Sequence, residues 1–251
     1  DATRWVVREA LYQGLMSLPE HLLQAWRSAR SARRRAAFLV RHAERGPVRE
    51  LATHEAVRLT ERGHRQAHEA GRQIAALSSS LTLHHSPVER CGETARGIAA
   101  GATEAGAAAQ VKGAVAMLGN PFIKDRARAW ALVTEIGPRF MREWFDGKLP
   151  PEVFEPRAPA ARAQLSAVGA ALDADADSDA ARVLITHDWN LAIVREELLG
   201  ITPERAWPAF LDGVVVSIDG DELLVEAHGR VGRIARHGTR SSGEQRDPLD
   251  V

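Results

Sequence analysis

The sequence predicts an α/β protein of three layers, in which helices cover both faces of a mainly parallel central sheet. Short apolar runs suited to buried strands alternate with longer amphipathic runs suited to helices. The chain has 251 residues, enough to bury a core of that size. Several of the expected strands end on charged side chains, as is typical of parallel sheets that carry a site at the carboxyl ends of their strands.

The elements follow from the pattern of apolar residues. The first strand is the apolar run Ala36 to Val40, and the first long amphipathic helix has Thr60 as a suitable N-cap. A closing hairpin has Gly220 and Asp221 at its turn. We expect strands at 36–40, 81–86, 111–115 and 182–188, helices at 59–77, 88–102 and 189–200, and the hairpin over 213–229.

Three parts of the chain depart from this alternation. Residues 1–35 form an N-terminal helical extension ahead of a main domain over 36–232. Within that domain, residues 119–159 are rich in aromatic residues and prolines and are interpreted as a helical insertion that caps the site. Residues 233–251 are polar and are expected to form a flexible tail.

Composition excludes several classes of partner. The formal net charge is zero, so the overall balance favours neither nucleic acid nor an anionic membrane. The arginine run at 33–35 is a nucleic-acid patch in one interpretation and a solvated link into the first strand in the favoured one. With Cys91 as the single cysteine and no apolar run long enough to cross a bilayer, we expect a cytoplasmic protein. The oligomeric state stays open, a dimer included.

Cations gather where three of the predicted strands end, and such ends lie side by side in a parallel sheet. These cations would repel one another unless an anion sat among them. Arginine forks bind phosphoryl oxygens in pairs and stay charged, which favours a phosphate pocket. The groups are Arg41, His42 and Arg45 after the first strand, Arg90 beyond the second, and His187, followed by Asp188, after the fourth.

The motifs "LVRHAERGP", "SPVERCGETA" and "LITHD" resemble those of the histidine phosphatase superfamily. Within it, the Arg-His-x-x-Arg-x-Pro start and the His-Asp pair look like the histidine acid phosphatase branch, not the phosphoglycerate mutase branch. Ala43 stands where the family usually has glycine. The resemblance implies a three-layer phosphoglycerate mutase-like fold.

The resemblance also implies a role for each residue. His42 would be the nucleophile that forms a phosphohistidine, and Asp188 would protonate the leaving group, with Glu93 as the alternative donor. Substrate contacts are expected further from the phosphate, and neither a metal nor a cofactor is required. The phosphate-binding set is Arg41, Arg45, Arg90 and His187, and the expected substrate contacts are Glu44, Lys124, Arg126, Trp189 and Asn190.

The predicted function is therefore a metal-independent phosphomonoesterase for a small organic phosphate. A mutase of the same superfamily and a non-catalytic phosphate-binding module are the alternatives. Two further patterns weakly resemble metal sites but are interpreted as ordinary surface features. His64 and His68 share a helix face without a third ligand, and residues 173–179 lack the glycine and glutamate of a calcium loop.

Overall fold

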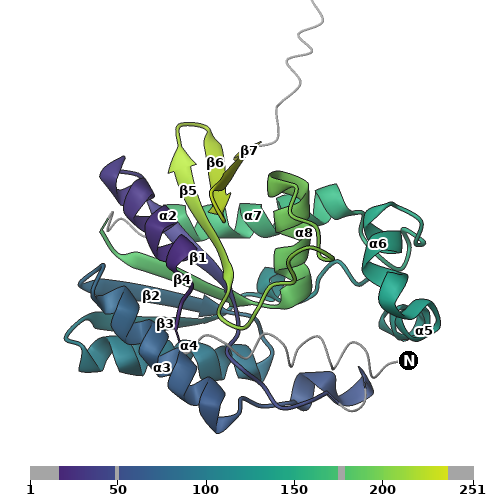
Figure 1. The fold of residues 1–251 in the computed structure, drawn as a ribbon, viewed down its shortest axis with the longest axis horizontal. Helices are drawn as coiled ribbons and strands as arrows, with labels where there is room; N and C mark the ends of the chain where they lie inside the picture. The colour runs from purple at the N-terminus through teal and green to yellow at the C-terminus, as the bar shows by residue number, and fades with distance from the viewer. Residues whose placement is uncertain (1–16, 49–50, 175–178, 237–251) are drawn as a thin grey trace, which may run out of the picture.

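The computed structural model describes residues 17–48, 51–174 and 179–236, and these form one seven-stranded sheet between helical layers (Figure 1). The strand order is β3-β2-β4-β1-β5-β6-β7. The strands are β1 (Ala36–Arg41), β2 (Ser80–His85), β3 (Ala108–Ala114), β4 (Ala181–Thr186), β5 (Gly213–Asp219), β6 (Glu222–Ala227) and β7 (Arg230–Ala235). The α-helices are α2 (Glu20–Ser31), α3 (Glu61–Ala75), α4 (Glu89–Glu104), α5 (Arg126–Ile136), α6 (Phe140–Phe145), α7 (Arg157–Ala174) and α8 (Asp188–Leu199), and short 3₁₀ turns lie at Leu51–Ala56, Ala116–Leu118 and Gly137–Arg139.

The sheet has a parallel half and an antiparallel half. Strands β3, β2, β4 and β1 are parallel neighbours, whereas β5, β6 and β7 add to the edge beside β1 in antiparallel order. The expected hairpin is confirmed, with Gly220 in the left-handed conformation at its turn. Because the four parallel strands share one direction, their carboxyl ends meet at one edge.

Alternation along β1 shows how the sequence builds two cores. Phe38 and Val40 face the core shared with α2, α3 and α4, and Leu39 faces the core shared with α7 and α8. A strand buried on both faces needs apolar residues at every position, which explains the continuous apolar run. The predicted three-layer α/β fold is confirmed.

The N-terminal extension is described from residue 17 onward, and the part before it lies outside the described residues. Helix α2 packs Trp26 against Phe38 of β1 with ring centroids 4.7 Å apart. The arginine run that follows is ion-paired: Arg34 lies 3.5 Å from Asp219 and Arg35 lies 3.1 Å from Asp173.

The predicted insertion contains α5 and α6, and its buried aromatic residues extend the core between the sheet, α7 and α8. Phe140 and Trp144 are buried and contact Trp189 at the start of α8. Trp130 of α5 is only partly buried and contacts His54 in an edge-on arrangement at 4.8 Å. Most of these aromatics therefore hold the insertion against the rest of the core, whereas Trp130 of α5 and Trp189 of α8 are partly exposed.

At the C-terminal end the sequence pattern missed a strand. Residues Arg230–Ala235 form β7 on the sheet edge, so the chain stays ordered past residue 233, where a tail was expected. The pattern is too polar to reveal an edge strand with one solvent-facing side. Residues 237–251 lie outside the described residues, as do 175–178 of the aspartate-rich segment.

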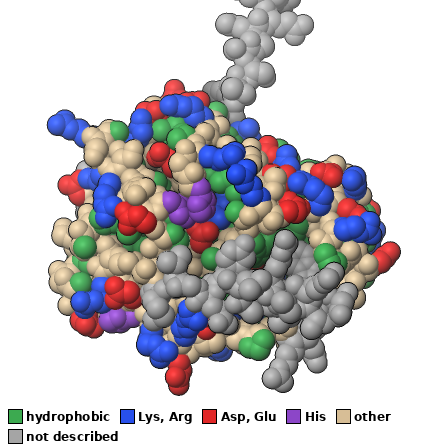
Figure 2. Space-filling view, in the orientation of Figure 1, with side chains coloured by type: hydrophobic (Ala, Val, Ile, Leu, Met, Phe, Trp, Pro, Cys, Tyr) green, Lys and Arg blue, Asp and Glu red, His purple; other side chains and the backbone are tan. Residues whose placement is uncertain are grey.

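Basic and acidic side chains are interspersed over the face shown in Figure 2, as expected for a chain without net charge. No helix in the described part of the chain is long and apolar enough to span a bilayer.

Candidate active site

Two histidines lie at the ends of adjacent parallel strands. Arg41 pairs with Thr186 in the register of β1 and β4, so His42 and His187 follow at neighbouring positions. The backbone N–H of His42 donates to Thr186 O at 3.0 Å, and the two imidazole centroids lie 5.5 Å apart. The sheet register thus places both rings at the carboxyl edge.

The ring of His42 is held in one tautomer. It is 1% exposed, and its Nδ1 lies 2.8 Å from the carbonyl oxygen of Ala43, which can only accept a hydrogen bond. Nδ1 must therefore carry the proton. Nε2 is left with a lone pair, and Arg90 Nε donates to it at 3.0 Å. An unprotonated Nε2 beside a guanidinium is arranged to attack an anionic phosphoryl group.

Arg90 joins both histidines from the first turn of α4. Besides Nε on His42, its Nη2 lies 3.4 Å from His187 Nδ1, and its Nη1 donates to His54 O at 2.8 Å. The side chain is 4% exposed. A buried guanidinium fixed at three points is a pre-organised anion binder.

Arg41 is held from the other side. Its Nη2 lies 2.8 Å from Asp188 Oδ2, its Nη1 donates to Pro208 O at 2.9 Å, and its guanidinium lies 4.2 Å from the centre of the Phe210 ring. These contacts use the loop before β5 as well as the start of α8. Arg41 and Asp188 therefore form an ion pair next to His42.

His187 is anchored by Ser86 at the end of β2. Ser86 Oγ lies 2.8 Å from His187 Nε2, and the backbone N–H of Val88 donates to the same hydroxyl at 3.2 Å. Cys91 is buried nearby, where desolvation raises the pKa of its thiol to about 12. That thiol stays protonated and takes part as a small apolar side chain.

The electrostatics keep both histidines neutral in the free protein. Burial lowers the pKa of His42 well below 6.5, and the charges of Arg90 and Arg41 lower it further. Burial and Arg90 likewise lower the pKa of His187 to about 3. Burial alone would raise the pKa of Asp188, but Arg41 and Arg45 hold it below 3.8. The site thus combines permanent cations with neutral imidazoles, a combination suited to a phosphate dianion.

A family model decides which family this site represents. The model described as "histidine phosphatase superfamily (branch 1)" matches residues 37–219, which include every residue of the site named so far. The chain belongs to the histidine phosphatase superfamily. Membership supports a phosphatase or phosphoryl-transfer activity in general. The predicted branch is wrong, since the match is to branch 1 and not to the acid phosphatases. The short His-Asp and Arg-x-Pro motifs carry less branch information than the whole of 37–219.

Solved structures agree on the fold. A mycobacterial glucosyl-3-phosphoglycerate phosphatase is 18% identical, with a TM-score of 0.50, over 78% of this chain and 99% of that one. A phosphoglycerate mutase from Bacillus anthracis is 12% identical, with a TM-score of 0.47, over 80% and 91%. A phosphoserine phosphatase from Entamoeba histolytica is 13% identical, with a TM-score of 0.44, over 80% and 95%. No curated protein sequence matches the chain. The likeness to the glucosyl-3-phosphoglycerate phosphatase, at this low identity, establishes the fold alone.

Ala43, the departure from the usual histidine phosphatase motif, fits its position. The residue is fully buried, its N–H donates to Thr94 Oγ1 at 3.1 Å, and its carbonyl fixes the His42 ring. It is not among the described non-glycine residues with positive φ. The backbone conformation at position 43 therefore does not require glycine, and the alanine methyl group packs in the core.

Glu44 and Arg45, which follow the histidine closely in sequence, both make contacts within the loop after β1. Glu44 accepts from Thr60 Oγ1 at 2.8 Å, and its backbone oxygen accepts from the Thr60 N–H. A Cβ on Gly63 would lie 2.0 Å from Glu44 O, so only glycine lets α3 approach this loop. Arg45 is partly buried and donates to Gly46 O at 2.9 Å, yet it is close enough to Asp188 to lower that pKa.

The other expected substrate contacts divide into two groups. Lys124 pairs with Glu155 at 2.7 Å within the insertion, and Arg126 pairs with Glu55 of the 3₁₀ turn at Leu51–Ala56 at 2.8 Å. Asn190 is buried and donates to Leu118 O at 3.0 Å, which ties α8 to the chain beyond β3. Only Trp189, next to Asp188, is partly exposed beside the catalytic groups.

Glu93, the alternative proton donor, is engaged elsewhere. Its Oε2 accepts from the backbone N–H of Leu59 at 3.0 Å, and its Oε1 lies 3.4 Å from Arg58 Nη1. Asp188 is instead ion-paired to Arg41, the neighbour of His42. The structure brings Asp188 to the histidines and uses Glu93 to hold the loop that ends at Thr60.

Sequence reasoning missed three residues of the site. Ser86 was within a quoted motif, and its place at a strand end was a usable signal. Phe210 and Pro208 lie in a loop without pattern, so their contacts with Arg41 could be found only in three dimensions.

Proposed function

We propose that this protein is a metal-independent phosphomonoesterase that hydrolyses a small organic phosphate through a phosphohistidine on His42. The observation that carries the proposal is the state of the His42 ring. Its Nδ1 proton is fixed on Ala43 O, and its Nε2 lone pair faces Arg90. A nucleophile prepared in this way needs no base to activate it.

In the first step, the bound phosphate takes over the hydrogen bond that Arg90 Nε donates to His42 Nε2. The freed Nε2 lone pair then attacks phosphorus, and the bond from phosphorus to the ester oxygen breaks. Arg41, Arg90 and Arg45 bind the non-bridging oxygens, and they supply the positive charge that a metal supplies in other phosphoryl-transfer enzymes. His187 completes the set when the bound dianion raises its pKa and it takes up a proton. The leaving alkoxide takes a proton from Asp188, which gives the free alcohol.

In the second step, water attacks the phosphorus of the phosphohistidine. The Asp188 carboxylate accepts a proton from the attacking water. The bond between phosphorus and Nε2 breaks, which returns neutral His42 and the protonated acid. The sum is ester plus water giving alcohol plus phosphate.

Asp188 must be protonated for the first step, although Arg41 keeps it ionised in the free protein. A phosphate dianion resolves this conflict, because it competes for the Arg41 guanidinium and adds negative charge beside the carboxylate. Both effects raise the pKa of Asp188. Substrate binding therefore favours the protonated form of Asp188, which is the form that can donate a proton.

The substrate body is proposed to be apolar or ring-containing. The support is the partly exposed pair Trp130 and Trp189, whose ring centroids lie 6.2 Å apart. Trp130 also contacts His54, whose backbone holds Arg90. A panel of sugar phosphates, nucleotides, prenyl phosphates and phosphopeptides tests this preference, and fastest turnover of a phosphopeptide would contradict it.

The activity is tested by phosphate release from an aryl phosphate in the presence of EDTA, with wild type, His42→Ala and Asp188→Asn. We expect release by wild type and none by His42→Ala. Isomerisation of a phosphate ester without phosphate loss would support the mutase instead. Binding of phosphate esters without turnover of any panel member would support the non-catalytic module.

A further inference from the structure

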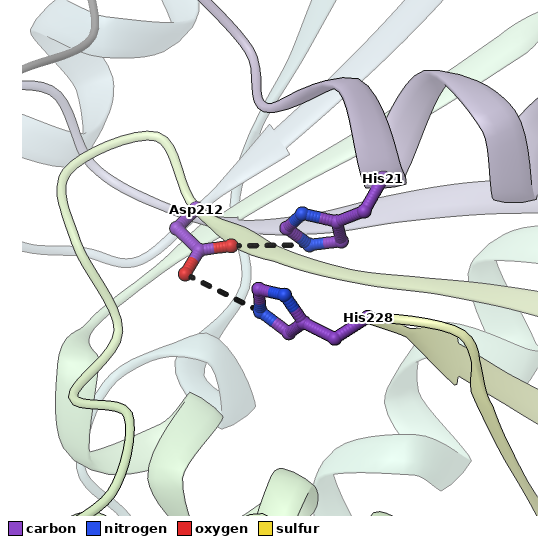
Figure 3. A group of neighbouring side chains, drawn as sticks. All are labelled: His21, Asp212 and His228. Atoms are coloured by element: carbon purple, nitrogen blue, oxygen red, sulfur yellow. Dashed lines mark ion pairs between the residues drawn. The ribbon is translucent and has the colours of Figure 1, made fainter.

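A second group of histidines lies outside the catalytic site. His21 of α2, Asp212 of the loop before β5, and His228 of the turn after β6 converge from three parts of the chain (Figure 3). Each offers one donor atom, and the three atoms lie within 4.8 Å of one another. Among the described residues, this is the one group of three or more histidine, cysteine or acidic residues with that spacing.

The three donor atoms lie close together. His21 Nε2 lies 3.3 Å from Asp212 Oδ1, and His228 Nε2 lies 4.0 Å from Asp212 Oδ2. The two imidazoles stack with centroids 3.8 Å apart. In a tetrahedral zinc site with bonds of about 2.0–2.2 Å, ligand atoms lie roughly 3.3–3.5 Å apart. Stacked rings direct their in-plane nitrogens side by side, so at least one imidazole must rotate before both nitrogens point at one ion.

One of these nitrogens is buried without a full hydrogen bond. His21 Nε2 is shielded from solvent, and its contact with Asp212 Oδ1 at 3.3 Å is too poorly aligned to count as a full hydrogen bond. A buried ring nitrogen normally has a partner. A metal ion would be a suitable partner for its lone pair. The His228 side chain is 41% exposed, which leaves a route from solvent to the group.

The carboxylate is held in the manner of a metal ligand. Asp212 Oδ1 accepts from Arg195 Nη2 at 2.5 Å and from the backbone N–H of Gly213 at 2.7 Å. These bonds orient the group and leave Oδ2 toward His228, as outer-shell partners orient carboxylate ligands. Arg195 repels a cation, so the affinity should be lower than that of an all-cysteine zinc site.

We propose that His21 Nε2, Asp212 Oδ2 and His228 Nε2 bind one divalent transition metal ion of the zinc class, with water at the fourth position. Two imidazoles and one carboxylate suit Zn²⁺ or Co²⁺, whereas Mg²⁺ and Ca²⁺ take oxygen ligands. The site goes beyond the proposed phosphatase reaction, which uses none of these three side chains.

The site is linked to the catalytic edge through the backbone. Asp212 O accepts from the N–H of Arg41 at 2.8 Å, and the same loop contacts the Arg41 guanidinium through Pro208 O and the Phe210 ring. An ion that ties Asp212 to α2 and to the β6–β7 turn would stiffen this loop. Its role is to position Arg41, and it takes no part in the chemistry.

The test measures metal binding by the full chain, which is prepared without a polyhistidine tag. Bound metal is first removed with EDTA, and the EDTA is then removed from the protein. Co²⁺ is titrated by its visible ligand-field absorption and then displaced by Zn²⁺. We expect one equivalent of saturable binding and a rise in melting temperature with Zn²⁺ concentration. His21→Gln and His228→Asn should each weaken Zn²⁺ binding more than about 10-fold, at least the cost of losing an outer-shell partner. Asparagine tolerates the positive φ of 51° at position 228.

The matched control is the double variant His64→Gln/His68→Gln on α3, which removes two histidines in helical i,i+4 spacing and should bind Zn²⁺ as wild type does. Nitrogen NMR shifts of the wild-type imidazoles identify the ligands independently, should a variant fail to fold. No saturable binding, binding that survives in folded His21→Gln and His228→Asn, or loss of binding in the control would each overturn the proposal.

Discussion

Two pairs of histidines in this molecule differ in the charges around them. His42 and His187 are buried beside Arg41 and Arg90, whose charges help to keep both rings neutral. His21 and His228 instead face a carboxylate, Asp212. Neutral imidazoles among guanidiniums suit an anion, and imidazole nitrogens beside a carboxylate suit a metal cation. The neighbours of a histidine, more than the histidine itself, determine its ligand.

The two regions also differ in how the fold builds them. The catalytic histidines follow adjacent parallel strands, whereas the second pair comes from a helix and a hairpin turn at distant points of the chain. Asp212 and Arg41 join the regions through one backbone hydrogen bond.

The largest effect is expected for His42→Ala. Removing the nucleophile should lower kcat by about 10⁴-fold or more, as for nucleophiles of other covalent enzymes. Phosphate release from an aryl phosphate measures it, with the exposed His64→Ala as the matched control. Turnover by His42→Ala within about tenfold of wild type would assign the nucleophile elsewhere.

Arg90→Lys should have the next largest effect. A lysine cannot contact His42, His187 and His54 O together, so the charge remains while the three-point geometry is lost. We expect kcat/KM to fall about 10²- to 10³-fold, the usual cost of one oxyanion-stabilising donor. Vanadate inhibition should weaken in parallel, and unchanged inhibition would place the phosphate away from Arg90.

Asp188→Asn should discriminate between leaving groups. Alkyl esters need a proton on the departing oxygen and should slow by about 100-fold or more, whereas aryl esters should slow much less. Glu93→Gln is the matched control and should leave the ratio of alkyl to aryl rates unchanged. The reverse pattern would make Glu93 the donor.

The pH dependence sharpens the same assignment. Because Asp188 has a pKa below 3.8 in the free protein, its protonated fraction falls as pH rises, and kcat/KM for alkyl esters should fall from pH 5 to pH 8. The pKa of His42 is also lowered, so acid should not remove the nucleophile in this range. Asp188→Asn should abolish the slope; a rate that rises with an apparent pKa near 6.5 would contradict the neutral His42.

The smallest effects are expected for Lys124→Ala and Arg126→Ala. Both side chains form exposed ion pairs within or beside the insertion, which contribute little. Each variant should change kcat/KM by less than about threefold. A loss of more than about tenfold for one substrate of the panel would show that the residue leaves its ion pair to bind that substrate.

Much of the fold was predictable because apolar runs report burial directly. The strand at Ala36 to Val40 and the helix with Thr60 as N-cap appear as expected, with ends shifted by one or two residues. The edge strand Arg230–Ala235 was missed because one polar side faces solvent. Helix α7 had too little periodicity to be assigned, since it is rich in alanine.

The catalytic edge was predictable because strand ends in a parallel sheet converge. That rule predicts that Arg41, His42 and His187 lie close together, and the structure places them so. The same rule covers Ser86 at the end of β2, although its role was missed. Contacts from loops follow no such rule, so the role of Phe210 emerged only from the structure. Glu44 shows the converse, since a residue next to the nucleophile in sequence is used to hold α3.

The most direct test of the phosphohistidine proposal is to quench wild type and His42→Ala during turnover and map the phosphoryl group by mass spectrometry under alkaline conditions, where phosphohistidine survives. The prediction is a single phosphoryl group on His42 that forms and decays at rates matching turnover. A phosphoryl group on another residue, or an equal amount in His42→Ala, would contradict the assignment of His42 as the nucleophile.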